Sequence, residues 1–307
     1  MLLRIGTRGS ALARAQAETV AARLRALDYG VEILVLSTAG DRATDRAFTD
    51  IGAFGVFVAE IEGALLDRSI DVAVHSYKDL PSRSVPGLVV AAVPERGDPA
   101  DVLLLREDAH SPYTKALPLG GGALVGTSAL RREALLREAR PDLVFALLRG
   151  NVVTRVQSLV NARFDAIVLA AAGLERLEAA HAATRFIVPR GITQVRLDPS
   201  IFVPAPSQGA LAVQVREDDA PVREAVTTLD DHTLADPLRA ERSALALVEG
   251  GCRLPFGAWC DRHSDGALVM HCVLGQPDGR LTRCRVTGHD PQQIAAIAYA
   301  ELTRTLS

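Results

Sequence analysis

The pattern of apolar and polar positions in the first part of the chain predicts strands that feed helices. From Ala13 to Leu27 apolar residues recur at helical spacing. Ser10 stands just before this stretch and is the expected N-cap, because its side chain can accept a hydrogen bond from the first helical turn. The predicted elements are strand 2–5, turn 6–9, helix 13–27, strand 31–36, helix 56–66 and strand 71–74. This alternation is typical of an α/β domain.

The middle of the chain repeats the same order of elements. We predict strand 124–125, a helix that runs to Arg140, strand 144–148, a helix that follows Asn151, strand 166–169 and helix 170–177. The segment 201–215 is predicted to be extended and to return to the first sheet, as in a chain that crosses between two lobes.

The last part of the chain has a different order and predicts a small α+β domain. Its elements are helix 237–248, strands 258–262, 267–274 and 280–286, and helix 291–306. The fold class is therefore α/β with three domains. Domain 1 is predicted at 1–96 and 200–220, domain 2 at 97–199 and domain 3 at 221–307.

Composition excludes several classes of protein. The chain has 307 residues and a net charge of −3, so a nucleic-acid partner is not expected. No apolar run approaches the ~18 residues of a membrane span, and the first residues do not resemble a signal peptide. We therefore expect a cytoplasmic protein without a membrane partner. The four cysteines match no C-x-x-C spacing, so neither a disulfide framework nor a metal site is expected.

Polar residues gather where the predicted strands end, which is where open α/β sheets bind ligands. Arginine binds carboxylates and phosphates through two parallel hydrogen bonds, so these residues suit a ligand with several such groups. Each arginine alone could equally be a solvated surface charge. The candidates are Arg8, Ser10, Lys78, Asp79, Thr127, Ser128, Arg131, Arg132, Arg149, Asn151 and Arg155.

Three further residues each have two interpretations. Asp79 beside Lys78 could be half of a surface ion pair, or an ionised carboxylate that stabilises a cation and transfers protons in a basic cleft. His75 is more typical of a hydrogen-bonded core residue than of a base. Cys252 could be a buried structural thiol, or a reactive thiolate that Gly250 and Gly251 present on a loop beside Arg253.

Six motifs together resemble the porphobilinogen deaminase (hydroxymethylbilane synthase) family. They occur in the family's order and span about residues 4 to 257. They are TRGSALA at 7–13, VHSYKDLP at 74–81, GTSALRR at 126–132, LRGNVVTR at 148–155, PAPSQGAL at 204–211, and ER at 241–242 followed by GGCRLP at 250–255.

The resemblance implies three domains, the first two arranged like a two-lobed periplasmic binding protein. It implies a dipyrromethane cofactor attached through Cys252, which primes the head-to-tail condensation of four porphobilinogens with loss of ammonia. The product would be hydroxymethylbilane, used in haem biosynthesis and passed to uroporphyrinogen-III synthase, and the enzyme would be a monomer.

The same resemblance assigns roles to individual residues. Asp79 would be catalytic. The cofactor would be held by Lys78, Ser128, Arg131 and Arg132, and the substrate by Arg8, Ser10, Thr127, Arg149, Arg155 and Gln208.

The chain departs from the family pattern at several positions. The family commonly has lysines in the loop around Phe54 and Ala59, which this chain lacks. Ser207 stands in place of a customary glycine, Ala129 of a serine and Gln214 of a glutamate. The basic residues at the strand ends would also suit two other classes of protein. One is a two-lobed anion-binding protein without catalysis, and the other is an enzyme that acts on phosphorylated metabolites. The first needs neither Cys252 nor Asp79, and the second lacks the Gly-Lys-Ser/Thr of a phosphate loop.

Overall fold

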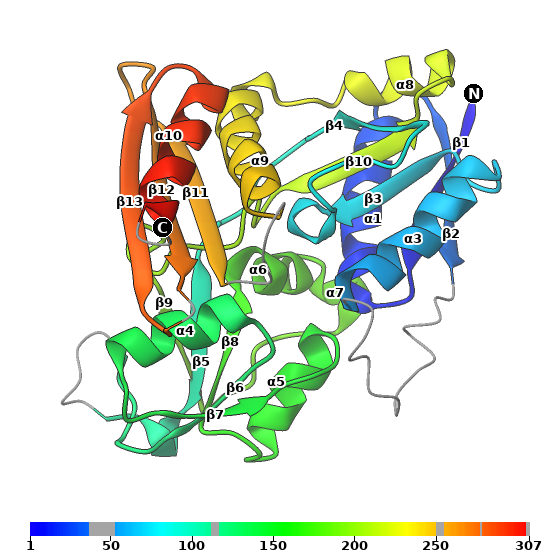
Figure 1. Ribbon diagram of the computed structural model, residues 1–307. Coiled ribbons are helices and arrows are strands. Elements are labelled where there is room, and N and C mark those ends of the chain that lie inside the picture. Colours follow the sequence, from blue (N-terminus) through cyan, green and yellow to red (C-terminus); the bar gives the residue numbers. More distant parts are fainter. Residues whose placement is uncertain (37–52, 112–116, 250–254, 277, 305–307) are drawn as a thin grey trace. The chain divides into compact units, whose positions relative to one another are not determined.

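A computed structural model describes residues 1–36, 53–111, 117–249, 255–276 and 278–304 of the chain (Figure 1). The described chain divides into two compact units. Unit 1 consists of Met1–Gly97, Ala179–Arg185 and Gly209–Ala235, and unit 2 of Asp98–Glu178, Phe186–Gln208 and Asp236–Ser307. No described helix is both long enough and apolar enough to span a bilayer.

Unit 1 is built on a five-stranded sheet with the order β2-β1-β3-β10-β4. Strand β1 is parallel to β2 and β3, whereas β10 is antiparallel to both of its neighbours. The elements are β1 Leu2–Arg8, α1 Ala11–Arg25, β2 Gly30–Leu36, α3 Ala53–Leu66, β3 Val72–Ser76, β4 Leu88–Ala92, α7 His181–Thr184, β10 Leu211–Arg216 and α8 Ala220–Thr227.

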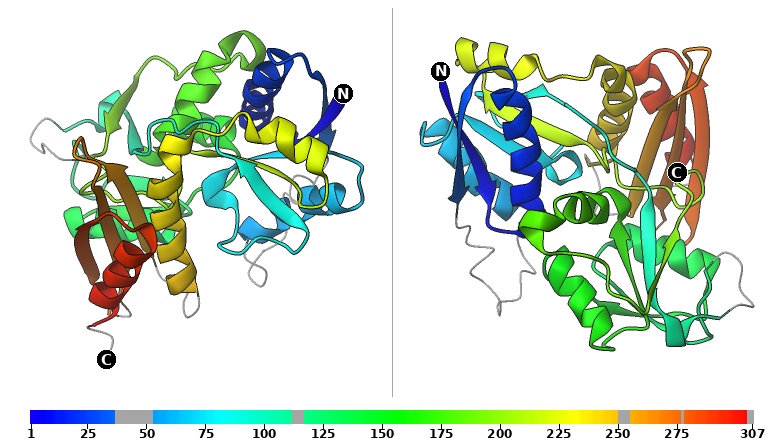
Figure 2. Two further views of the ribbon diagram at one scale, coloured as in Figure 1. Left: turned by 90° about the horizontal axis from the view of Figure 1, so that it is seen from above. Right: turned by 180° about the vertical axis from the view of Figure 1, so that it is seen from behind.

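Helices cover both faces of this sheet because its strands are apolar on both sides. Val72 and Val74 of β3 point to the face covered by α1 and α8, and Ala73 points to the face covered by α3. The right-hand view of Figure 2 shows α1, in dark blue, beside the strands of this sheet. The predicted N-cap is confirmed, since Ser10 Oγ accepts the Ala13 N–H at 3.2 Å.

Two details of the predicted first domain were wrong. Strand β1 continues through the predicted turn at 6–9, because Gly6 and Arg8 pair with β2. The segment 201–215 does return to the first sheet as β10, as predicted, but its first half consists of turns rather than extended chain. Ser207 in this stretch has a φ of 62°, which breaks the extended path.

Unit 2 contains a second five-stranded sheet, with the order β7-β6-β8-β5-β9. Its pattern of parallel and antiparallel pairs repeats that of the first sheet. Its elements are β5 Asp101–Arg106, β6 Leu124–Thr127, α4 Leu130–Ala139, β7 Val144–Leu147, α5 Val152–Val160, β8 Ala166–Ala170, α6 Ala171–Ala179 and β9 Ile192–Arg196. Sequence reasoning missed β4, β5, β9, α7 and α8.

Unit 2 also contains the predicted small α+β domain, an antiparallel sheet with the order β11-β12-β13. Alternate residues of each strand pack against two helices in one core, and Val273 on the other face joins the core of the second five-stranded sheet. The elements are α9 Ala235–Glu249, β11 Phe256–Arg262, β12 Leu268–Gly275, β13 Leu281–Gly288 and α10 Pro291–Thr303. The predicted fold class, α/β with a small third sheet, is confirmed.

Candidate functional site

In unit 1 the predicted site residues lie at one edge of the sheet. Arg8 ends β1, and Ser10 begins α1 directly after it. Lys78 and Asp79 are half-buried in a single 3₁₀ turn that follows β3. Because β1 and β3 are parallel neighbours, their carboxyl ends meet at the same edge. The structure therefore brings these four side chains to one edge of unit 1.

The turn that carries Lys78 and Asp79 is fixed to its neighbours by hydrogen bonds. The N–H of Tyr77 donates to the carbonyl of Ala210 at 2.9 Å, just before β10. Gln16 of α1 donates through Nε2 to Ser76 Oγ at 2.9 Å. The backbone that presents Asp79 is thus held by both β10 and α1.

His75 belongs to the core, as its pattern indicated. Its Nε2 lies 3.1 Å from Gln214 Oε1, and Gln214 Nε2 donates to Glu62 Oε1 at 2.9 Å. Since the amide nitrogen of Gln214 donates to Glu62, its oxygen accepts a hydrogen bond from the Nε2–H of His75. Burial lowers the pKa of His75 to about 4, although the hydrogen bond to Gln214 opposes the shift. The imidazole is therefore neutral near pH 7.

In unit 2 a second set of predicted residues lies at the carboxyl ends of β6 and β7, which are parallel neighbours. Thr127 Oγ1 accepts the N–H of Ala129 at 3.2 Å, while Ser128 is exposed beside it. Arg149 follows β7 and is also exposed. Arg155 donates through Nε to the carbonyl of Gly150 at 2.7 Å.

The helix that follows β7 begins with a side-chain cap. Asn151 Oδ1 accepts the N–H of Thr154 at 3.0 Å, so this predicted site residue has a local structural contact. The cap fixes the start of α5, and α5 in turn carries Arg155.

Three further predicted ligand residues gather around a buried carboxylate that sequence reasoning missed. Asp101 is completely buried at the start of β5. Arg131 Nη2 donates to its Oδ2 at 2.8 Å, and Arg132 donates to its Oδ1 through Nη2 at 2.7 Å. Gln208 Nε2 donates to the same Oδ1 at 2.9 Å. An aspartate directly before the apolar run VLLL was the available signal for a buried charge.

The charges around Asp101 do not cancel. Burial alone would raise the pKa of Asp101, but Arg131 and Arg132 outweigh it and hold the pKa far below its usual range. Two guanidiniums therefore face one carboxylate, which leaves one net positive charge. Arg131 has five N–H groups and gives one to Asp101 and one to the carbonyl of Val203. Its Nε donates to no residue in the described part of the chain.

Cys252 lies outside the described residues, between α9 and β11. The segments that flank it are joined by Glu241 of α9, which is completely buried. Glu241 accepts the N–H of Ser207 through Oε2 at 2.6 Å and that of Cys260 through Oε1 at 2.8 Å. The hydroxyl of Ser207 is itself buried, and no residue in the described ranges forms a hydrogen bond with it.

The residues of unit 2 fit a cofactor that carries carboxylates. The Arg131–Arg132 pair retains a net positive charge and N–H groups that no described residue accepts, and carboxylates are the usual partners of such groups. No group of three metal-ligating side chains gathers among the described residues.

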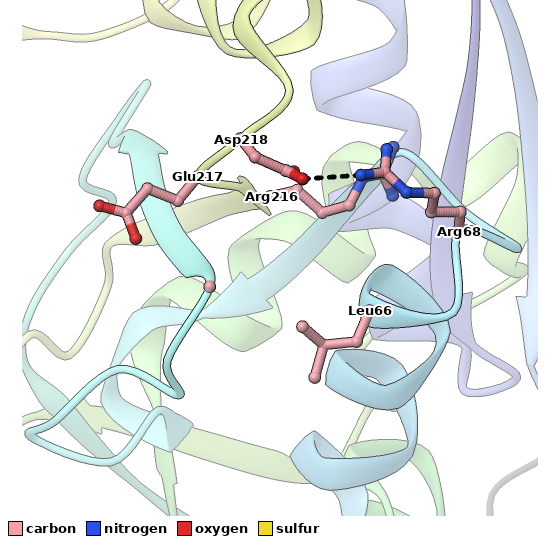
Figure 3. A pocket seen from close by; sticks show the side chains of 6 residues that line it. Leu66, Arg68, Arg216, Glu217 and Asp218 are labelled. Carbon is pink, nitrogen blue, oxygen red and sulfur yellow. Dashed lines mark hydrogen bonds and ion pairs between the residues drawn. The ribbon is translucent and has the colours of Figure 1, made fainter.

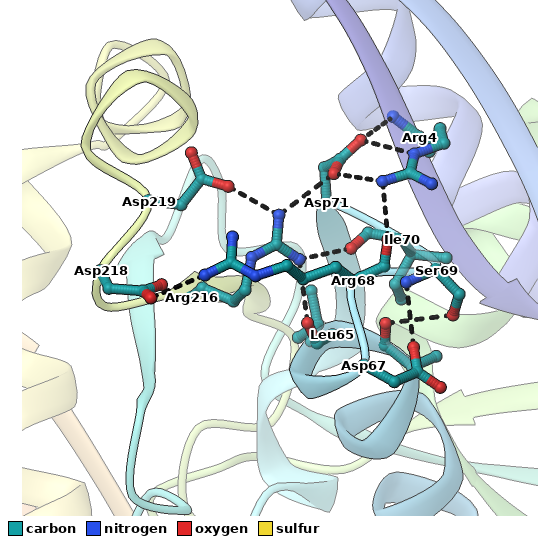
Figure 4. A network of polar contacts seen from close by, with 11 residues as sticks. Arg4, Leu65, Asp67, Arg68, Ser69, Ile70, Asp71, Arg216, Asp218 and Asp219 are labelled. Atoms are coloured by element: carbon teal, nitrogen blue, oxygen red, sulfur yellow. Dashed lines mark hydrogen bonds and ion pairs between the residues drawn. The ribbon is translucent and has the colours of Figure 1, made fainter.

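A separate polar network occupies the opposite edge of the unit 1 sheet (Figure 4). Asp71 accepts hydrogen bonds from Arg4 Nη2 at 2.8 Å and from Arg216 Nη2 at 3.1 Å. Burial opposes ionisation of Asp71, yet the bonds from Arg4 and Arg216 lower its pKa to about 2. This network joins β1, β3 and β10 at their other ends.

A pocket of about 340 Å³ adjoins this network (Figure 3). An ion pair between Arg68 and Asp218, 2.7 Å apart, lies in its lining. The lining residues are Leu66, Arg68, Gly87, Arg216, Glu217 and Asp218. Because two arginines and two carboxylates line it, the pocket has no net charge to attract an anion.

The sheets and the basic residues at their strand ends define an α/β protein equipped to bind acidic ligands. Comparison with known families agrees with the resemblance in the motifs. The family model "Porphobilinogen deaminase, dipyromethane cofactor binding domain" matches residues 3–224, and "Porphobilinogen deaminase, C-terminal domain" matches residues 237–303. The chain belongs to the porphobilinogen deaminase family, and it is an enzyme of the hydroxymethylbilane synthase class.

Curated relatives match over most of their length. A porphobilinogen deaminase of Sorangium cellulosum is 44% identical, over 92% of this chain and 89% of its own. One of Syntrophobacter fumaroxidans is 42% identical, over 91% of this chain and 85% of its own. Among solved structures, the BvgS periplasmic VFT2 domain of Bordetella pertussis is 15% identical, over 79% of this chain and 92% of that one, with a TM-score of 0.43.

Proposed function

We propose that this chain condenses four porphobilinogens head to tail, with loss of one ammonia for each, and releases hydroxymethylbilane. The observation that carries the proposal is the match of both family models, together with the candidate site residues at the strand ends of both sheets. The alternative of a two-lobed anion-binding protein is not favoured, because the matched family contains a domain for a dipyrromethane cofactor.

The cofactor would be attached through the Cys252 sulfur, and when bound it supplies the free pyrrole carbon that accepts the first substrate. Arg131 and Arg132 would hold its carboxylates, helped by Lys78 and Ser128. Support comes from the net positive charge beside Asp101 and from the N–H groups of Arg131 that no described residue accepts.

Substrate carboxylates would be bound by the remaining strand-end residues. Each porphobilinogen bears an acetate and a propionate, and guanidiniums bind such groups through paired hydrogen bonds. The proposed substrate ligands are Arg8, Ser10, Thr127, Arg149, Arg155 and Gln208. Gln208 differs from the other five, because it is completely buried against Asp101; it would therefore act on the substrate indirectly, by holding the carboxylate that positions Arg131 and Arg132.

Asp79 would act on the reacting atoms. Loss of ammonia from porphobilinogen leaves a cation, and a nearby carboxylate stabilises such charge. When the new carbon–carbon bond has formed, the attacked pyrrole carbon must lose a proton, which Asp79 can accept. The fixed 3₁₀ turn supports this role, because it holds the carboxylate at the end of β3.

We further propose the domain division given by the sequence, with Asp79 in domain 1, the arginine-rich wall in domain 2 and Cys252 in domain 3. The enzyme would act in the cytoplasm as a monomer, and uroporphyrinogen-III synthase would take its product.

The test is intact-mass spectrometry of the denatured protein beside Cys252→Ser, with Cys260→Ser as the matched control. The wild type and the control should both carry the mass of two condensed pyrrole units, and Cys252→Ser should lack it. The rate of porphobilinogen turnover should be proportional to the fraction of protein molecules that carry this added mass. A protein that is made with ample porphobilinogen, and has neither the added mass nor turnover, would contradict the proposal.

A further inference from the structure

Three cysteines outside the proposed site lie on one face of the small sheet. Cys260 is on β11, Cys272 on β12 and Cys284 on β13, and all three belong to the core that α9 and α10 cover. Within the described part of the chain, none of the three is joined in a disulfide. None of them has a part in the proposed reaction.

Cys272 and Cys284 are direct partners in the antiparallel register of β12 and β13. Directly opposed residues on one face of such a pair have Cβ atoms about 4.5–5.5 Å apart, and a disulfide requires about 3.5–4.5 Å. A small approach of the two strands therefore suffices. Cys260 differs, because its partner in the register is Met270.

The two paired thiols differ in reactivity. Cys272 is 1% exposed, whereas Cys284 is only half-buried, and its Sγ donates to the carbonyl of Ala298 on α10 at 3.7 Å. A hydrogen bond from Cys272 lowers the pKa of Cys284, and the same bond raises the pKa of Cys272. Since the thiolate is the attacking form, Cys284 is the thiol that reacts first.

We propose that Cys272 and Cys284 form a reversible thiol–disulfide site that reacts with low-molecular-weight disulfides. The Cys284 thiolate attacks one sulfur of the small disulfide and expels one thiolate. Cys272 then gives up its proton, attacks the Cys284 sulfur and expels the second thiolate. The protein loses two hydrogens and the small disulfide is reduced to two thiols. The product joins β12 to β13 covalently, and a small thiol in excess reverses the reaction.

The test uses the full-length, folded protein as isolated, incubated with oxidised glutathione at neutral pH. Remaining thiols are then alkylated, and peptide mapping locates the modified cysteines. The expected result is a single Cys272–Cys284 disulfide, with a mass loss of about 2 Da that dithiothreitol reverses.

Single variants separate the steps of the reaction. Cys272→Ser should stop at a mixed disulfide of glutathione with Cys284. Cys284→Ser should form no internal disulfide. Cys260→Ser is the matched control, because it removes a buried thiol from the same face, and it should oxidise at the wild-type rate.

Three results would overturn the inference. One is a wild type that stays reduced while an exposed thiol on a reference protein is oxidised. Another is an internal disulfide that uses Cys260, and the third is a Cys272–Cys284 disulfide that forms only after circular dichroism has registered unfolding. If a variant fails to fold, the peptide map of the wild type still decides among these results.

Discussion

Asp101 and Arg132 form a buried ion pair in which the carboxylate oxygen Oδ1 accepts two hydrogen bonds from one guanidinium, from Nη2 at 2.7 Å and from Nε at 3.1 Å. Arg131 binds the other oxygen of the same carboxylate. The two arginines that the motif GTSALRR presents are therefore oriented from within the protein before any ligand arrives.

The first prediction concerns this carboxylate. Asp101→Asn leaves two buried guanidiniums without their counter-charge, and breaking a buried ion pair costs about 3–5 kcal/mol. Urea denaturation should report a loss of that size. Asp108→Asn is the control, since its exposed pair with Arg106 contributes less than about 1 kcal/mol. Equal losses in the two variants would rule out a special role for Asp101.

The second prediction tests the proposed catalytic carboxylate. Asp79→Asn keeps the shape of the side chain but removes its charge and its capacity to accept a proton. We expect kcat, normalised to the fraction of protein that carries the cofactor mass, to fall by about 10²–10⁴-fold. Asp218 forms an exposed ion pair with Arg68 at the opposite edge of the sheet. The control variant Asp218→Asn should therefore retain full activity. Wild-type turnover in Asp79→Asn would refute the assignment.

The third prediction is a pH dependence of stability from His75. Its pKa is about 4 in the folded protein and 6.5 as the ordinary value, so the unfolded chain binds the proton more tightly between these pH values. The contribution of His75 to the free energy of unfolding should therefore be fully present above pH 6.5. The free energy of unfolding should decline by up to about 3 kcal/mol as the pH falls to 4.

Thermal or urea unfolding at several pH values measures this decline. His75→Gln should lack this part of the pH dependence, and His289→Gln, an exposed control, should keep it. The same slope in wild type and His75→Gln would show that other groups cause it.

The fourth prediction is that Ser207→Gly stabilises the protein. A side chain at a φ of 62° costs about 1–2 kcal/mol relative to glycine. The buried hydroxyl, which has no hydrogen-bond partner among the described residues, adds to this cost. The greater freedom of glycine in the unfolded chain offsets about 0.5–1 kcal/mol. A net gain of about 1 kcal/mol is expected by urea denaturation.

Ser207→Ala separates the two contributions, because it removes the hydroxyl and keeps the strained backbone. Any increase in the free energy of unfolding of Ser207→Ala should come from removal of the hydroxyl alone. A Ser207→Gly variant that is less stable than the wild type would contradict the prediction, because it would show that the Ser207 hydroxyl stabilises the folded protein.

Local signals along the chain predicted much of the fold. Ser10 caps α1 as expected because an N-cap depends only on nearby residues. The order of strands and helices in the small third sheet followed from periodicity. Strand β5 was missed because its apolar run is short, and a short run does not distinguish strand from helix. The prolines at 204 and 206 suit an extended chain, yet the structure forms turns around the buried N–H of Ser207.

The candidate site was predicted as a set of residues, but not as a set of contacts. Strand ends predicted correctly which side chains share an edge in each sheet. The roles of those side chains depend on partners far away in the sequence, such as Asp101 for Arg131 and Glu62 for Gln214. Neither partner belongs to a motif, so no spacing rule could have found it.

The place of β10 in its sheet sets the order in which the chain can fold during synthesis. Among the strands of the described ranges, β4 pairs with β10 alone, so the first sheet cannot be completed until residue 216 has left the ribosome. All five strands of the second sheet lie between residues 101 and 196, and they emerge before β10. Domains usually fold from the N-terminus onward as they are made. Of the two five-stranded sheets, the one that begins first is therefore finished second, and its β3 and β4 edges stay unpaired with β10 while the other sheet forms.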